Sequence, residues 1–249
     1  MQRLDPTAAA LEVVASRFGD AAVTFLAGSV MLGEATPTSD LDLVVVHERL
    51  EAAYRESFVH GGWPVEAFVH DPETLQHFFG MDRTRGVLQH MVANGVPLPK
   101  ETDLSRTLTA LAVEAIRTGP QPWSDADIAA SRYEITNLID DIRSPHSNEE
   151  LTATGAQLYE TLAKHFLLTR GQWSATGKSI PRRLALADPA FAARFSAAFA
   201  HLFQDSQSDA VISLSEEVLM PSGGWLFAGY KAVAPKDWRL SRASGPPAN

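Results

Sequence analysis

Residues 28–46, GSVMLGEATPTSDLDLVVV, join two short apolar runs, 23–27 and 43–46, through a polar loop. Short apolar runs bounded by turn-forming residues predict buried strands. Side chains alternate between the two faces of a strand, so Asp40 and Asp42 point the same way at the head of the second strand. Two neighbouring carboxylates repel each other unless a cation neutralises them. The spacing therefore predicts a divalent metal site where the loop enters the sheet.

The other end of this loop carries a Gly-Ser pair, Gly28 and Ser29, directly after the first apolar run. Such a turn brings backbone N–H groups and a hydroxyl up to an anion. Mg²⁺ is held by carboxylates and takes further ligands from phosphate oxygens. Metal-binding carboxylates beside a phosphate-binding turn indicate phosphoryl or nucleotidyl transfer.

Five residues of the stretch resemble the active-site signature of the polymerase-β-like nucleotidyltransferases, in which GS is followed by a loop and then (S)DxD. They are Gly28, Ser29, Ser39, Asp40 and Asp42. Many members carry an Arg where this chain has Leu32, and the aminoglycoside (streptomycin/spectinomycin) adenylyltransferase branch often lacks it too. The resemblance implies that Asp40 and Asp42 hold two Mg²⁺ ions. It also implies that the Gly-Ser pair and Ser39 contact ATP or another NTP.

A third acid, Glu66, lies in the apolar run PVEAFVH and in a strand predicted over residues 65–70. A carboxylate in such a run is costly unless it is paired or metal-bound. In the resembled family a third carboxylate comes from a strand adjacent to the DxD strand. The resemblance therefore implies that Glu66 is a metal ligand, and either Glu66 or an acid of the helical part is the general base. The alternative is an edge-strand Glu that faces solvent.

The chain divides into two predicted domains. Short strands alternate with helices up to residue 102, and from residue 103 nearly to the end apolar residues recur at helical spacing. The fold class is therefore α+β. We expect an N-terminal α/β domain with a small mixed sheet, residues 1–102, which the resemblance implies is a nucleotidyltransferase domain, followed by an all-α helical-bundle domain, residues 103–249. The tail from about residue 237 is expected to be disordered because it is polar and rich in Pro and Gly.

Two local expectations concern the first domain. The pattern over residues 48–59 predicts an amphipathic helix that ends at Gly61-Gly62. Residues 96–98 predict a short strand, and Pro97 and Pro99 exclude a central position for it because proline cannot donate to the ladder.

The helix expected over residues 125–143 carries three acids spaced seven residues apart, each one residue before an isoleucine of the apolar stripe. They are Asp127, Glu134 and Asp141. An enzyme that modifies a polycationic drug needs acids to bind ammonium groups and to remove a hydroxyl proton. The alternative is an ordinary solvated helix face.

The run RGQWSATGKSIPRRL also resembles the helical domain of the aminoglycoside adenylyltransferases, which carries a similar T-G-K-x-x-P-[KR] sequence. The matching residues are Thr176, Gly177, Lys178, Pro181 and Arg182. The resemblance implies that Lys178 contacts the nucleotide phosphates and neutralises the leaving pyrophosphate. The alternative is a solvated loop lysine.

The composition of the chain limits the kinds of molecule that it is expected to bind. The net charge of −9 argues against a nucleic-acid binder, which needs a basic face, and suits a cationic small molecule or simply solubility. The absence of cysteine excludes disulfides and a cysteine nucleophile. Neither a signal peptide nor a membrane-spanning run is recognised, so a cytoplasmic protein is expected. The oligomeric state, monomer or dimer, stays open.

Three functions are compatible with these residues. The favoured one is Mg²⁺-dependent transfer of AMP from ATP to a hydroxyl of an aminoglycoside-type antibiotic, with release of pyrophosphate. A second keeps the chemistry but uses a protein or RNA acceptor, as in the nucleotidyltransferases of toxin–antitoxin pairs, and the long helical domain argues against it. A third is a non-catalytic nucleotide-binding protein of the same fold, and the intact acids argue against that.

Overall fold

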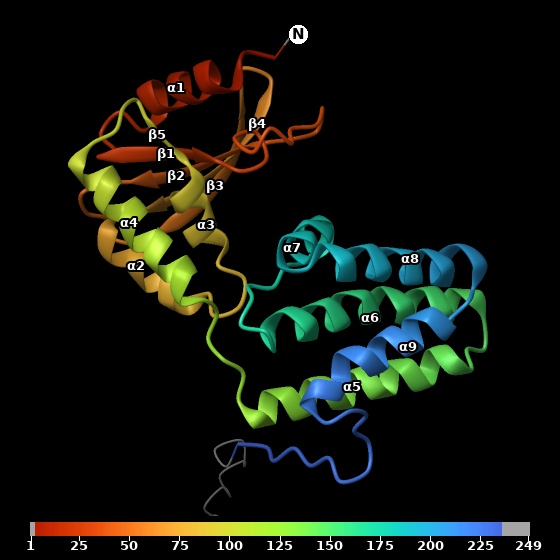
Figure 1. Cartoon of the computed structure of the whole chain (residues 1–249). Helices are drawn as coiled ribbons and strands as arrows, with labels where there is room; N and C mark the ends of the chain where they lie inside the picture. Colours follow the sequence, from red (N-terminus) through yellow and green to blue (C-terminus); the bar gives the residue numbers. More distant parts are fainter. Residues whose placement is uncertain (1–2, 236–249) are drawn as a thin grey trace, which may run out of the picture. The chain divides into compact units, whose positions relative to one another are not determined.

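The computed structural model describes residues 3–235 of the 249-residue chain. These residues form two compact units (Figure 1). The first unit extends to Pro122 and also takes in Arg170–Ala175, and the second comprises Trp123–Thr169 and the chain from Thr176 onward. The tail predicted to be disordered lies outside the described residues.

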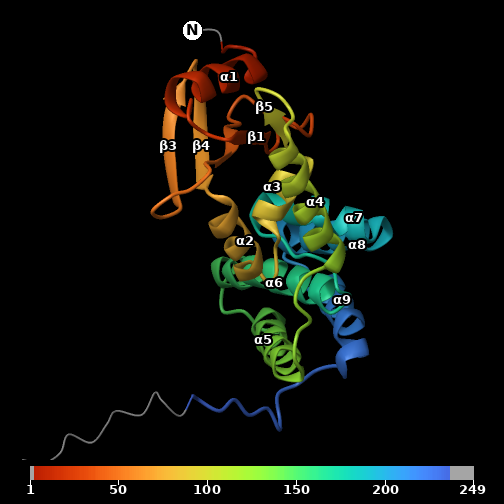
Figure 2. The ribbon, with the colours of Figure 1, turned by 90° about the vertical axis from the view of Figure 1, so that its left-hand side faces the viewer.

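A five-stranded sheet forms the centre of the first unit, in the order β3-β4-β2-β1-β5. The strands are β1 (Val23–Ala27), β2 (Leu41–Val46), β3 (Tyr54–His60), β4 (Trp63–His70) and β5 (Val96–Leu98). Only β2 and β4 run parallel, and the other neighbours are antiparallel, so the sheet is mixed as predicted. Figure 2 shows β3 and β4 side by side at one edge. The proline-containing β5 lies at the opposite edge, which confirms the expectation from Pro97 and Pro99.

The helix predicted over residues 48–59 is wrong, because Tyr54–His60 forms strand β3. Gly61 and Gly62 have φ angles of 56° and 81°, and they form a two-residue turn in which His60 pairs with Trp63. Turns with positive φ at both central positions match the twist of a β-hairpin, and glycine adopts them without strain. The glycines therefore join two strands instead of ending a helix.

Helices cover both faces of this sheet (Figure 1). Helix α1 (Pro6–Arg17) lies on one face, and α2 (Pro72–Met81), α3 (Val87–Asn94) and α4 (Asp103–Thr118) lie on the other. Alternate residues of β1 and β2 point into the two resulting cores, since Leu26 and Leu43 pack on the α1 side while Phe25 and Val44 pack on the other. This alternation is the period-two pattern of a sheet buried on both faces.

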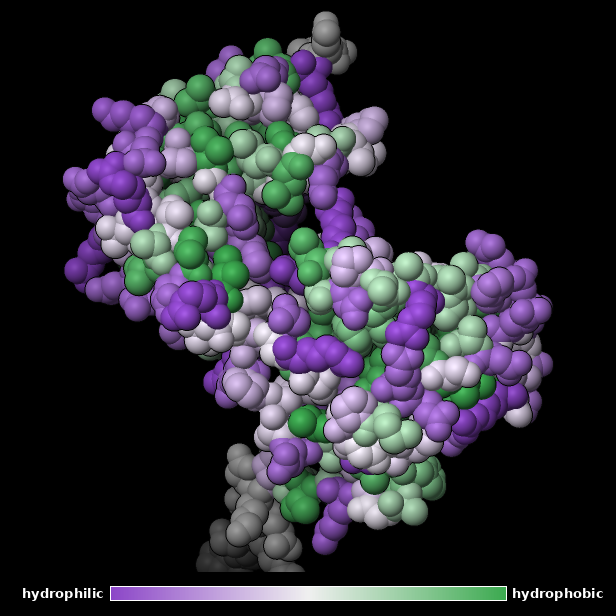
Figure 3. All heavy atoms as spheres, in the orientation of Figure 1, coloured by the Kyte–Doolittle hydropathy of each residue, from purple (hydrophilic) through white to green (hydrophobic). Residues whose placement is uncertain are grey.

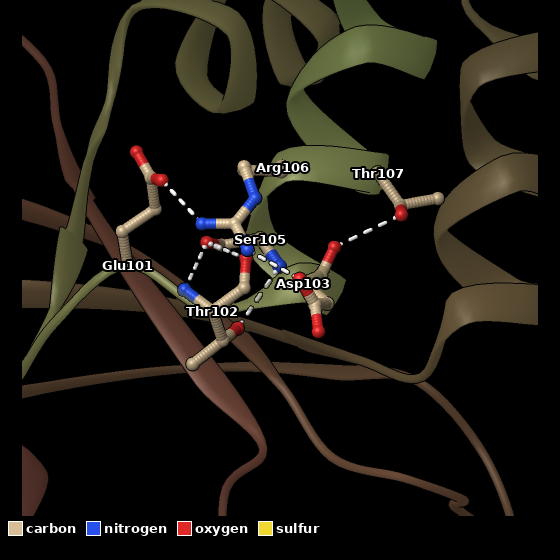
Figure 4. Close-up of polar contacts among 6 residues, drawn as sticks. All are labelled: Glu101, Thr102, Asp103, Ser105, Arg106 and Thr107. Carbon is tan, nitrogen blue, oxygen red and sulfur yellow. Dashed lines mark hydrogen bonds and ion pairs between the residues drawn. The ribbon is translucent and has the colours of Figure 1, made fainter.

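Helix α4 begins with a capping box (Figure 4). Thr102 Oγ1 accepts a hydrogen bond from the Ser105 amide at 3.1 Å, and the Thr102 amide donates to Ser105 Oγ at 2.8 Å. Arg106 forms ion pairs with Glu101, at 2.6 Å, and with Asp103. The two hydrogen bonds between Thr102 and Ser105 satisfy backbone amides at the start of the helix that would otherwise have no partner.

The division of the chain by contacts differs from the predicted boundary at residue 103. Helix α4 packs on α3, and its Leu108 and Ala112 are part of the sheet's core, so α4 belongs to the first unit. The later segment Arg170–Ala175 belongs there as well. Trp173 Nε1 donates to the Ile116 carbonyl at 3.1 Å, and the Trp173 ring packs against Gly86.

The second unit is entirely helical, as the sequence predicts. Its α-helices are α5 (Asp125–Arg143), α6 (Asn148–Leu168), α7 (Ile180–Ala187), α8 (Pro189–Asp205) and α9 (Asp209–Leu219), with 3-10 turns η1 (Gly177–Ser179) and η2 (Met220–Ser222). Its core is rich in aromatic rings. Phe166 of α6 stacks on Phe191 of α8 at 3.6 Å, and Phe195 and Phe199 are fully buried beside them.

In the space-filling view, hydrophobic residues are scattered among hydrophilic ones over the face turned to the viewer (Figure 3). Such scattering is normal for a folded protein surface. Within residues 3–235, none of the helices combines the length and the apolar character that crossing a bilayer requires.

Candidate functional site

The three acids singled out in the sequence come together at one end of the β2–β4 pair. The parallel register places Asp42 of β2 directly opposite Glu66 of β4, and Asp40 precedes β2 by one residue. One oxygen from each carboxylate lies within 4.8 Å of the others, and all three side chains are half-buried. Carboxylate oxygens are the ligands that Mg²⁺ prefers, so this donor set fits a divalent cation.

Glu66 already has a cationic neighbour. Arg55 of β3 donates from Nη2 to Glu66 Oε2 at 2.5 Å, and its guanidinium lies over the ring of Phe68 at 4.8 Å. The sequence did not single out Arg55, because it falls in the segment predicted as a helix. The available signal for a strand was the Gly61-Gly62 pair, since two glycines in succession are typical of a β-hairpin turn, and such a turn would place Arg55 beside β4.

Gly28 lies against the acidic cluster. It follows Ala27, which pairs with Asp42 across β1 and β2, and it has a φ of +77°. A Cβ atom at this position would lie 2.0 Å from Asp42 Oδ2. Only glycine lets the backbone turn so close to the carboxylate, because it combines free access to positive φ with the absence of a side chain.

Hydroxyl groups join the two ends of the loop. Ser29 Oγ donates to Ser39 Oγ at 3.2 Å, and Ser39 Oγ also accepts from the Thr36 amide at 2.8 Å. Ser39 is buried, and its own amide donates to the Thr36 carbonyl at 3.0 Å. Its hydroxyl therefore organises the loop next to Asp40, while Ser29 lies at the Gly-Ser turn.

The candidate substrate acids lie on α5 of the second unit. Asp127 completes the capping box of this helix, where its Oδ2 accepts from Ser124 Oγ at 2.6 Å and from the Ser124 amide at 2.9 Å. The hydrogen bonds from the Ser124 side chain and backbone hold the pKa of Asp127 below its ordinary value. Asp127 thus has a structural task. Glu134 accepts from Gln157 at 3.3 Å, and Asp141 is exposed.

Lys178, the candidate phosphate ligand, also lies in the second unit. It is exposed in the η1 turn, and the neighbouring Gly177 amide donates to Glu160 Oε1 at 2.9 Å. This contact ties the turn to α6 and leaves the Lys178 ammonium in solvent. Loops held on a rigid helix in this way are common places for binding residues.

Comparison with known proteins gives one family match, which lies within the first unit. Residues 8–78 match the family model of the nucleotidyltransferase domain, and this segment includes the acidic cluster and the Gly-Ser turn. The match covers less than half of the chain, and it supports nucleotidyl transfer as the general class of activity. No curated protein matches the sequence of this chain.

One solved structure similar to this chain is a nucleotidyltransferase-like protein from Exiguobacterium sibiricum 255-15. The two sequences are 13% identical, and the superposition covers 86% of this chain and 74% of that chain with a TM-score of 0.45.

Proposed function

We propose that this protein is a Mg²⁺-dependent nucleotidyltransferase that moves AMP from ATP to a hydroxyl of a small cationic acceptor of the aminoglycoside type. The observation that carries the proposal is the convergence of Asp40, Asp42 and Glu66 within 4.8 Å, inside the segment that matches the nucleotidyltransferase domain. Arg55 supplies one positive charge to this cluster of three carboxylates, and a divalent cation would supply further positive charge.

The residues of the first unit divide the task between metal and nucleotide. Asp40 and Asp42 would hold two Mg²⁺ ions, and Glu66 would complete the coordination of one of them. When bound, such ions neutralise phosphate charge and make a hydroxyl more acidic. Ser29 and backbone N–H groups after Gly28 would bind the phosphates of ATP, since Gly28 brings this turn close to Asp42.

The reaction needs a proton acceptor and a group that balances the charge of the leaving pyrophosphate. The acceptor oxygen forms a bond to the α-phosphorus, while the bond from that phosphorus to the oxygen bridging the α- and β-phosphates breaks. Pyrophosphate leaves with the bridging oxygen. Glu66, or an acid of the second unit, takes the hydroxyl proton. Lys178 offers a positive charge to the pyrophosphate. Positioning and charge neutralisation supply most of the catalysis in this class of reaction.

Charge supports a cationic acceptor. The chain carries a net charge of −9, and Glu134 and Asp141 are exposed acids on one helix of the second unit. Exposed carboxylates bind ammonium groups and raise the local concentration of cations. Asp127 is the weakest of the three candidates, because its carboxylate caps α5.

The test is pyrophosphate release from Mg-ATP with streptomycin, spectinomycin and other aminoglycosides as separate acceptors. Asp42→Asn protein serves as the blank, and Asp20→Asn, an exposed acid in the same unit, serves as the matched control. We expect release with one acceptor class in the wild type and in the control, and none in the blank. Equal release from the blank would reject the metal site. Binding of Mg-ATP without pyrophosphate release in the presence of any of these acceptors would favour a protein or RNA acceptor.

A further inference from the structure

The three acids of the cluster are not held in the same way. Asp42 and Glu66 lie inside β2 and β4, where the ladder between the two strands fixes their backbones. Asp40 lies outside, because β2 and its pairing with β4 begin at Leu41. Among the described residues, the Asp40 carboxylate makes no side-chain hydrogen bond or ion pair. Something other than the sheet must therefore fix the direction of this side chain.

Arg3, from the segment before α1, reaches the backbone immediately before Asp40. Its Nη1 donates to the carbonyl of Ser39 at 3.2 Å, and its Nε donates to the carbonyl of Gly62 at 3.1 Å. Its guanidinium also lies over the ring of Trp63, at 4.4 Å from the ring centre. One planar fork thus connects the metal-binding loop to the β3–β4 hairpin.

The anchor at the hairpin end of this connection is itself well held. Trp63 is buried, and its Nε1 donates to the Leu4 carbonyl at 2.9 Å. The Leu4 amide in turn donates to the Gly61 carbonyl at 3.3 Å. The two backbone hydrogen bonds of Leu4 fix the chain next to Arg3, and the Trp63 ring supports the Arg3 guanidinium. A guanidinium that is fixed in this way loses little further rotamer freedom when it binds a carbonyl.

The Ser39 carbonyl is the decisive contact because it belongs to the peptide group that joins Ser39 to Asp40. Rotation of that peptide plane changes the direction of the Asp40 side chain. The Ser39 amide and hydroxyl are already bound to Thr36, so the carbonyl is the remaining polar group that can set the plane. Arg3 makes no ion pair with any residue that the structure describes, which leaves its donors for these backbone carbonyls.

We propose that Arg3 is a positioning residue that orients Asp40 for metal binding, an inference that rests on the proposed function. It acts through the Ser39–Asp40 peptide and does not touch metal or nucleotide. Groups that orient metal ligands from outside the coordination sphere typically change metal affinity by about 10–100-fold when they are removed. For Arg3→Ala we expect a loss at the lower end, about tenfold, because only one of the three acids is affected.

The sign of this effect separates positioning from simple electrostatics. Arg3 carries a positive charge, and removing a positive charge from the neighbourhood of a cation site favours the bound cation. Positioning predicts the opposite, a weaker metal complex. A weaker complex in Arg3→Ala is therefore evidence for orientation of Asp40.

Arg17 offers a matched control. It also stacks on an aromatic ring of the β3–β4 hairpin, with its guanidinium 4.2 Å from the centre of Phe58, and it pairs with Glu56 at 2.6 Å. Its polar contacts among the described residues go to Glu56 and not to the loop. Arg17→Ala therefore removes a similar stacking contact from the same hairpin and leaves the Ser39 carbonyl untouched.

The experiment measures Mn²⁺ binding to the full nucleotide-free chain by titration calorimetry. Arg3→Ala should bind Mn²⁺ about tenfold more weakly than the wild type, and Arg17→Ala should bind as the wild type does. Raised Mg²⁺ should restore nucleotidyl transfer in Arg3→Ala, and Arg17→Ala shows what the loss of a stacking contact on the hairpin does by itself. Unchanged Mn²⁺ affinity in Arg3→Ala, or an equal loss in Arg17→Ala, would overturn the inference.

Amide hydrogen exchange distinguishes a failure of this inference from a failure of the proposed function. If wild type and Asp42→Asn bind Mn²⁺ equally, the metal site is rejected and the calorimetry no longer reports on Arg3. Exchange at residues 39–41, measured without metal, still does. It should be faster in Arg3→Ala than in the wild type and Arg17→Ala, and equal exchange in all three proteins would reject the role of Arg3.

Discussion

Gly28 and Asp42 are packed so closely that a Cβ atom on the glycine would lie 2.0 Å from Oδ2 of the aspartate. The two residues come from opposite ends of the loop between β1 and β2, and the antiparallel pairing of Ala27 with Asp42 brings them together. The Gly-Ser pair and the D-L-D triplet therefore depend on each other sterically. A side chain at position 28 would therefore collide with the carboxylate of Asp42, the candidate metal ligand.

Gly28→Ala should consequently abolish nucleotidyl transfer and Mn²⁺ binding, because the new methyl group displaces the Asp42 carboxylate. Gly33→Ala is the matched control, since Gly33 lies in the same loop with a φ of +71° and has open space around its Cβ position. Both variants should lose about 1–2 kcal/mol of stability from a left-handed alanine. Calorimetry with Mn²⁺ should separate them, and loss of binding in both would show that backbone strain alone is responsible.

Asp42→Asn should remove the stabilisation that Mg²⁺ gives to the fold. Without metal, its melting temperature should equal or slightly exceed that of the wild type, because one of three clustered carboxylates becomes neutral. At ten times Kd, Mg²⁺ should stabilise the wild type by about 1.4 kcal/mol and leave the variant unchanged. Thermal melting with and without Mg²⁺ measures both effects, and an equal gain in the two proteins would contradict metal binding by Asp42.

Asp71→Ala should lower stability at neutral pH by about 2 kcal/mol, the upper part of the range for helix N-caps. The buried Asp71 carboxylate caps α2 through the Thr74 amide at 2.8 Å and also accepts from the Leu50 amide at 3.0 Å. Asp5→Ala, which removes the exposed cap of α1, should cost less. Urea denaturation at pH 7 compares the two, and a larger effect at Asp5 would contradict the role of burial.

The same contacts make the contribution of Asp71 depend on pH. Hydrogen bonds from Thr74 and from the Leu50 amide hold its pKa below the ordinary value. The stabilisation is therefore fully present above the unfolded pKa of about 3.9 and is lost as the pH falls through the lower folded value. The stability difference between wild type and Asp71→Ala should shrink correspondingly in acid, and a constant difference would show that the charge has no part in it.

His70 should make the protein less stable below pH about 6.5. Burial lowers its pKa, with the charge of Asp71 acting against this shift, and among the described residues its Nδ1 has no hydrogen-bond partner. In that pH range the unfolded chain binds a proton that the folded chain does not, so stability falls as pH falls. His70→Leu should flatten this dependence in urea denaturation at pH 5.5 and 7.5. An equal slope in the wild type and in His70→Leu would contradict the prediction.

The acidic cluster could be predicted because each of its residues stands out in its own short stretch of sequence. Asp40 and Asp42 share a face by strand alternation alone, and Glu66 stands out as a charge in an apolar run. The family resemblance, and not the residues themselves, implies that the strand of Glu66 lies next to the strand of Asp42, and the parallel register that puts the two acids opposite each other is seen only in the structure. The geometry of the three acids agrees with that expectation, whereas their role stays a prediction.

The residues around the cluster could not be predicted in the same way. Arg55 could not be predicted as a neighbour of Glu66, because the pattern over residues 48–59 predicts a helix and a glycine pair fits a helix end as well as a hairpin turn. Arg3 acts on carbonyls 36 and 59 residues away in the sequence. A backbone carbonyl has no signature in sequence, so a side chain that binds one is found only in the folded structure.

Because Arg170–Ala175 belongs to the first unit, that unit cannot be completed during synthesis until the intervening helices of the second unit have been made. Trp173, which packs against Gly86 and donates to the Ile116 carbonyl, leaves the ribosome only after α5 and α6 have been made. Helices of the second unit therefore emerge before the surface that Trp173 covers on the first unit can be completed. Trp173 is synthesised more than fifty residues after the end of α4 at Thr118, the helix whose Ile116 carbonyl accepts the hydrogen bond from Trp173.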